Sequence, residues 1–143
     1  MTAQAVYTVM ALDIGEQRTG VALANNVVRI ASPLQTLSEP SQLTEDVKRL
    51  VNKHDVKTMV VGLPRGLQGQ DTPQTVYVRH IATQLEKEIA IPVHFIDEAA
   101  TSVKAETELQ ARKKPYAKED VDMLAATYIL EDFLREHPEE LDV

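Results

Sequence analysis

The 143-residue sequence contains no cysteine, and this absence excludes several kinds of site at once. A disulfide framework, a thiolate zinc site, an iron–sulfur cluster and a cysteine nucleophile all require thiols. The chain also lacks an apolar run long enough to cross a bilayer, and no basic region precedes the apolar stretch near its start. We therefore expect a cytoplasmic protein with no membrane partner.

The rest of the composition is that of an ordinary globular domain. Hydrophobic residues make up 43% of the chain and charged residues 26%, so we do not expect disorder. The length is typical of one domain. We expect that domain to occupy residues 1–136, followed by an acidic, frayed tail over residues 137–143.

The net charge of −7 argues at first against a nucleic-acid partner, but its distribution weakens the objection. A charge of −5 lies in Glu131–Val143 alone. Basic side chains gather elsewhere, and the predicted phosphate contacts are Arg18, Arg65, Arg112, Lys113, Lys114 and Lys118. The alternative for the run from Arg112 is a solvated helix end.

Hydrophobic spacing predicts strands alternating with helices. The expected strands cover residues 7–13, 20–24, 27–30, 58–63 and 92–97, and the expected helices residues 43–54, 78–89, 102–112 and 119–136. The turn dipeptide at residues 25–26 predicts an antiparallel hairpin with residues 27–30 as its second arm. Strands joined by helices run parallel, so we expect an α/β fold with one mixed sheet.

All five glycines fall in two segments that we expect to be loops at the ends of strands. The first segment contains Gly15 and Gly20, and the second contains Gly62, Gly66 and Gly69. Glycine lets a backbone approach a ligand closely, so two such loops at one sheet edge indicate a cleft. For either loop alone, ordinary turn chemistry is an equally good explanation.

Acidic residues recur at the same edge. Asp13 ends the first strand, and Asp97–Glu98 end the last. Asp122 heads the apolar stripe of the final helix, where a carboxylate is costly unless it is paired or bound to a metal. Clustered carboxylates repel one another, and Mg²⁺ or Mn²⁺ relieves that repulsion and supports phosphodiester hydrolysis. Individually, each acid could instead serve as a turn, cap or helix-start residue.

Four segments in this order resemble the YqgF family of pre-16S ribosomal RNA nucleases, also called Holliday-junction-resolvase-like proteins. The segments are Asp13–Ala22, Val61–Pro64 with Gly69, Asp97–Glu98 with Thr101–Ser102, and Asp122–Ala126 with Ile129, Leu130 and Phe133. The resemblance implies a ribonuclease-H-like fold with a five-stranded mixed sheet. It also implies a metal-dependent nuclease that acts on RNA or DNA.

The resemblance implies the acidic triad Asp13, Glu98 and Asp122, and it alone selects Glu98 over Asp97. The sequence departs from the family at Ala99, where arginine is usual, and at Gln17, where a basic residue is common. Two alternatives remain, a nucleic-acid-binding factor without catalysis and an actin-like nucleotide-binding protein. The sequence leaves a homodimer open.

Overall fold

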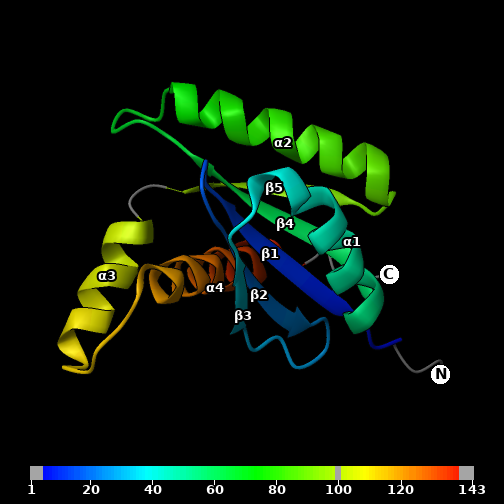
Figure 1. Cartoon of the computed structure of the whole chain (residues 1–143). Helices are drawn as coiled ribbons and strands as arrows, with labels where there is room; N and C mark the ends of the chain where they lie inside the picture. Colours follow the sequence, from blue (N-terminus) through cyan, green and yellow to red (C-terminus); the bar gives the residue numbers. More distant parts are fainter. Residues whose placement is uncertain (1–4, 99–100, 139–143) are drawn as a thin grey trace.

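The computed structural model describes residues 5–98 and 101–138, except for the side chains of residues 101 and 102. Five strands form one sheet in the order β3-β2-β1-β4-β5 (Figure 1). Their bounds are β1 Thr8–Ile14, β2 Thr19–Asn25, β3 Ser32–Leu37, β4 Val56–Pro64 and β5 Val93–Glu98. Strands β1, β4 and β5 run parallel, whereas β2 is antiparallel to both β1 and β3. The predicted mixed sheet is confirmed.

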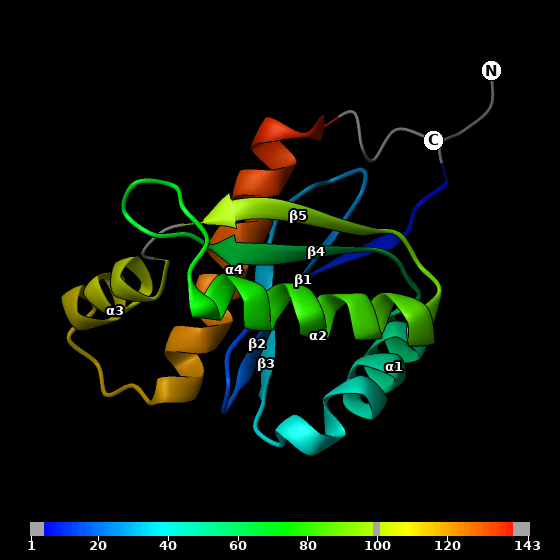
Figure 2. The ribbon, with the colours of Figure 1, turned by 90° about the horizontal axis from the view of Figure 1, so that it is seen from above.

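Helices cover both faces of this sheet. Helices α1 (Leu43–His54) and α2 (Pro73–Ile89) lie on one face, and α4 (Lys118–Glu136) crosses the other (Figure 2). Helix α3 (Thr101–Ala111) packs beside the first half of α4 (Figure 1). In the described residues, no helix is long and apolar enough to cross a membrane.

Helix α4 packs closely because it presents a stripe of small and apolar side chains to the sheet. Ala125, Ala126, Ile129 and Phe133 recur at helical spacing, and each is at most 1% exposed. The sheet side of this cluster consists of Val9, Ala11, Ala22, Ala24, Val60 and Ile96. The predicted apolar stripe headed by Asp122 therefore does face the sheet.

The predicted strand over residues 27–30 is wrong, and β3 supplies the second arm of the hairpin instead. The side-chain oxygen Oδ1 of Asn25 accepts hydrogen bonds from the backbone N–H groups of Val27 and Val28, which closes a local turn. Arg29 then adopts a φ of 59°. Pro33 is tolerated in β3 because that strand lies at the sheet edge.

Candidate active site

The parallel strands bring two of the predicted acids to one edge of the sheet. Asp13 is the next-to-last residue of β1, and Glu98 ends β5. Side chains alternate along a strand, so Asp13 shares the α4 face with Val9 and Ala11, which lie in the α4 cluster. Glu98 shares that face with Ile96 for the same reason.

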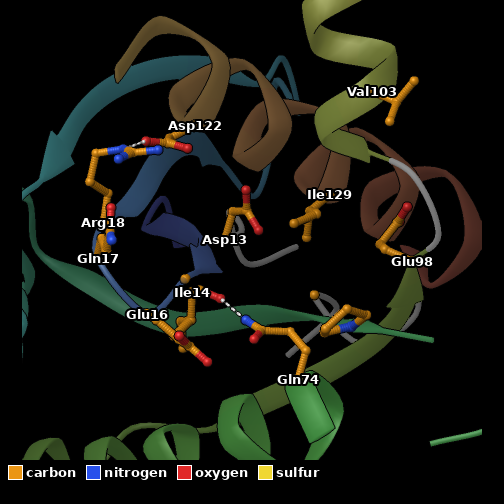
Figure 3. Close-up of a pocket in the computed structure, with 13 residues that line it drawn as sticks. Asp13, Ile14, Glu16, Gln17, Arg18, Gln74, Glu98, Val103, Asp122 and Ile129 are labelled. Atoms are coloured by element: carbon orange, nitrogen blue, oxygen red, sulfur yellow. Dashed lines mark hydrogen bonds and ion pairs between the residues drawn. The ribbon is translucent and has the colours of Figure 1, made fainter. Parts of the chain in front are cut away.

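A cavity of about 460 Å³ opens at this edge, between the strand ends and helices α3 and α4. Asp13, Glu98 and Asp122 all line it, although they come from three distant parts of the chain. In Figure 3, Asp13 lies between the other two acids. The remaining walls include Gly15, Glu16, Gln17, Arg18, Gly62, Pro64, Gln74, Val103 and Ile129.

Gly20 explains how Asp122 comes so near Asp13. Gly20 is the partner of Asp13 in the β1–β2 register. A Cβ atom at Gly20 would lie 1.9 Å from the backbone oxygen of Asp122, which no packing can accommodate. The first turns of α4 therefore rest directly on the backbone of β2.

Gly20 and Gly62 belong both to the segments expected as loops and to the strands expected over residues 20–24 and 58–63, and the structure places them inside β2 and β4. Both are needed for packing, because a Cβ atom at Gly62 would lie 2.5 Å from Cδ1 of Ile129 in α4. Gly15 and Gly69 do lie in the expected loops, and Gly69 has a φ of +79°.

The electrostatic environment of Asp13 favours its neutral form. Burial raises the pKa of its carboxyl from 3.8 to about 7, and the negative charge of Asp122 adds to the rise. A carboxylate in this position is poorly solvated and faces a second one. A positive charge placed between the two acids would therefore stabilise the ionised form of Asp13.

Glu98 has a second acid as its neighbour. Its pKa is raised to about 8 by burial, by a hydrogen bond with Asp132 and by the negative charges of Asp132 and Glu136. The sequence interpretation missed Asp132. Its position three residues after Ile129, beside the apolar stripe of α4, could have indicated it.

The three acids share a cavity but do not form a closed ligand cage. In residues 5–98 and 101–138, no three acidic or histidine side chains lie close enough together to hold one metal ion. Asp13 and Asp122 interact electrostatically, whereas Glu98 interacts with Asp132. Glu98 would have to turn from Asp132 to join the other two.

Arg18 is the basic side chain that reaches this cavity. Its Nε donates a hydrogen bond of 2.6 Å to Oδ2 of Asp122, and the two side chains are 27% and 16% exposed (Figure 3). Gln17, which stands at a position where the family often has a base, also lines the cavity. Ala99 lies outside the described residues.

Arg65, in contrast, is not among the residues that line the cavity. Its Nε donates a hydrogen bond of 3.0 Å to Asp97, and its Nη1 donates one to Asp71. Asp97 points outward, with a side chain that is 68% exposed. Asp97 is therefore engaged on the surface, while Glu98 faces the cavity.

The predicted basic segment connects α3 to α4 and lies apart from this cavity. Arg112 pairs with Glu108 at 3.3 Å, whereas Lys113, Lys114 and Lys118 are exposed. Arg112 and Lys114 line a second groove, of about 460 Å³, along α3 and α4. Of the six predicted phosphate contacts, the structure thus brings Arg18 to the acids and places four others between α3 and the start of α4, outside the cavity.

The family known as RuvX, described as Holliday junction resolvase, matches residues 7–136. The chain belongs to the RuvX family. A relative from Chloroflexus aurantiacus named "Putative pre-16S rRNA nuclease" is 38% identical over 130 residues, 88% of this chain and 85% of its own. A relative of the same name from Moorella thermoacetica is 37% identical, over 88% of this chain and 93% of its own. The resemblance to YqgF nucleases is therefore confirmed.

Solved structures show the fold of this RuvX family member independently. RuvC from Thermus thermophilus, in complex with a Holliday junction substrate, superimposes with a TM-score of 0.54. The match covers 92% of this chain and 97% of RuvC at 14% sequence identity. The second structure of that RuvC gives a TM-score of 0.52. The chain thus has the predicted ribonuclease-H-like fold.

Proposed function

We propose that this RuvX family member is a metal-dependent nuclease that hydrolyses phosphodiester bonds in structured RNA or branched DNA, with Asp13, Glu98 and Asp122 as its catalytic acids. The observation that carries the proposal is the convergence of these three acids on one cavity at the carboxyl edge of the sheet. Ligand sites in open α/β sheets lie at this edge.

The chemistry of the donors fits Mg²⁺ or Mn²⁺. Carboxylate oxygens are the hard ligands that these ions prefer, and Asp13 and Asp122 already interact electrostatically across the cavity. We assign the ion to these two acids, with Glu98 as the third ligand. When bound, such an ion polarises a phosphoryl oxygen and lowers the pKa of water.

The side chains of the chain itself supply the remaining functions. Because its pKa is about 8, the carboxyl of Glu98 must release a proton before it can serve as the third ligand of the ion. The guanidinium of Arg18 can bind a phosphate at the cavity. Lys113, Lys114 and Lys118 would bind the more distant backbone of a long nucleic acid.

The names of the relatives favour pre-16S rRNA as the substrate, and we expect processing of its 5′ end from the resemblance to the YqgF family. The RuvC structure with a bound Holliday junction leaves branched DNA as a second candidate substrate. Either substrate implies action in the cytoplasm. Family membership and the three acids favour catalysis over a binding factor without activity, because a binder of polyanions gains nothing from clustered carboxylates. They also favour a nuclease over an actin-like nucleotide-binding protein.

The test is a cleavage assay on labelled single-stranded RNA, single-stranded DNA and a four-way DNA junction. Each substrate is incubated with Mg²⁺, Mn²⁺ or EDTA. Size-exclusion chromatography of the same protein measures whether it is a homodimer. We expect cleavage of at least one substrate with metal and none in EDTA. Full activity in EDTA, or no cleavage of any substrate, would refute the proposal.

A further inference from the structure

The contact between Arg18 and Asp122 joins two parts of the chain that are 104 residues apart. A tight turn presents Arg18, because the Gly15 N–H donates a 2.9 Å hydrogen bond to the Arg18 carbonyl. The guanidinium thereby lies against a carboxylate that faces Asp13, a second acid. Arg18 is thus the counter-charge for the same acids that the proposed function assigns to a metal ion.

A guanidinium and a divalent cation compete for the same carboxylate oxygen, because both need its lone pairs and its charge. The contact with Asp122 uses Nε of Arg18, at 2.6 Å from Oδ2. Both side chains are partly exposed, so solvent can replace this contact without burying a lone charge. The pair is therefore suited to exchange rather than to a permanent structural role.

We propose that Arg18 is a positioning residue that holds Asp122 until a divalent cation takes its carboxylate, and then turns to bind the substrate phosphate. This inference rests on the proposed function and adds the order of events, in which the cation binds first and Arg18 then binds the phosphate. Arg18 restrains Asp122 beside Asp13 and lowers their mutual repulsion. Once released, its planar fork offers paired N–H donors to a phosphate at the mouth of the cavity.

The first test measures Mn²⁺ binding by calorimetry on the full chain, with no substrate present. We expect Arg18→Gln to bind Mn²⁺ about three- to tenfold more tightly than the wild type, the scale of one partly exposed ion pair. Arg79→Gln is the matched control, because the Arg79 side chain on α2 is 42% exposed and pairs with Asp71 instead. We expect the Mn²⁺ affinity of this control to match that of the wild type.

The second test measures binding of a fluorescent single-stranded RNA in EDTA and in Ca²⁺, a cation that takes the same oxygen ligands. In EDTA, Arg18 is engaged by Asp122, so Arg18→Gln should change RNA affinity by less than about twofold. In Ca²⁺, the same substitution should weaken RNA binding about three- to tenfold. It should also reduce the salt slope, the slope of log affinity against log salt concentration, by about one.

Three outcomes would overturn the inference. Unchanged or weaker Mn²⁺ binding by Arg18→Gln would make the pair a structural contact or a support for the ligand. An equal loss of RNA affinity in EDTA and in Ca²⁺ would make Arg18 a constant phosphate contact. A wild type that binds no Mn²⁺ would overturn the proposed function and this inference together, which distinguishes that failure from the other two.

Discussion

At the residue scale, the structure separates two neighbouring acids that the sequence places side by side. Glu98 faces the cavity and contacts Asp132, whereas Asp97 points outward and pairs with Arg65. Strand alternation requires that only one of them can face α4. The choice of Glu98 came from the family resemblance, and the geometry gives it a physical basis.

We therefore predict opposite results for the two conservative substitutions. Glu98→Gln should lower the cleavage rate by at least about 100-fold, because removing even an outer partner of a metal site typically costs 10–100-fold. Asp97→Asn is the matched control and should retain the rate within about threefold. Single-turnover cleavage with Mn²⁺ measures both. An inactive Asp97→Asn with an active Glu98→Gln would reverse the assignment.

The raised pKa values of Asp13 and Glu98 predict that stability depends on pH in an unusual direction. In the folded chain these carboxyls hold their protons up to about pH 7 and 8, whereas in the unfolded chain they ionise near pH 4. Over that interval the folded state binds more protons, so stability is lost as pH rises from about 4 to about 8.

Thermal melts in EDTA across that interval test this expectation. The melting temperature should fall as pH rises, and Asp13→Asn should flatten the dependence. Glu106→Gln, at an exposed position of α3, is the control and should leave the dependence unchanged. A wild-type melting temperature that rises steadily from pH 5 to pH 8 would contradict the electrostatic account of the cavity.

At the scale of elements, the close approach of the start of α4 to β2 depends on the absence of a side chain at Gly20. A side chain at Gly20 would meet the backbone of Asp122, which cannot rotate away, whereas one at Gly62 would meet the flexible side chain of Ile129. We predict that Gly20→Ala destabilises the fold by about 1–3 kcal/mol and Gly62→Ala by less. Gly20→Ala should also reduce cleavage, because Asp122 moves with the helix. Urea unfolding measures the stability of the two variants, and single-turnover assays measure their cleavage rates. Equal effects of Gly20→Ala and Gly62→Ala would contradict this explanation.

The basic segment between α3 and α4 gives a prediction about binding. Replacing Lys113 and Lys114 with Ala should weaken the binding of every nucleic-acid substrate alike and reduce the salt slope by about two. The reason is that both side chains are exposed and that sequence-independent contacts act through phosphates. Lys53→Ala with Lys87→Ala, on α1 and α2, is the matched control. Unchanged affinity and slope in the Lys113/Lys114 variant would make this segment a solvated surface.

The elements that the sequence predicts well are those with a strong apolar period. Helix α1 is an example, because Leu43, Val47, Leu50 and Val51 mark its buried face. The second arm of the hairpin was misplaced because Val27, Val28 and Ile30 are apolar yet exposed. Their strand-like composition was overridden by the local turn that Asn25 closes.

At the scale of the whole molecule, the sequence predicts which acids converge but not what each of them touches. Asp13 and Asp122 could be placed from strand ends and helix spacing, because these follow from periodicity. The contacts of Asp122 with Arg18 and of Glu98 with Asp132 depend on side-chain conformations across distant segments. No local pattern encodes such pairs, so they emerge only from the assembled fold.

The central claim is that Asp13 and Asp122 act as one metal-dependent unit. Its most direct test is single-turnover cleavage in Mn²⁺ and in EDTA by the wild type, Asp13→Asn, Asp122→Asn and the double variant. Asp120→Asn is the control, because Asp120 accepts a 2.8 Å hydrogen bond from the Ala117 N–H at the start of α4, an interaction that asparagine can retain.

Residues that act as a unit are strongly non-additive. The account predicts that each single variant loses at least about 100-fold in rate, that the double variant is no slower than either, and that EDTA abolishes wild-type cleavage. Asp120→Asn should cleave at the wild-type rate. A fully active Asp122→Asn beside an inactive Asp13→Asn would contradict the claim and leave α4 as scaffold.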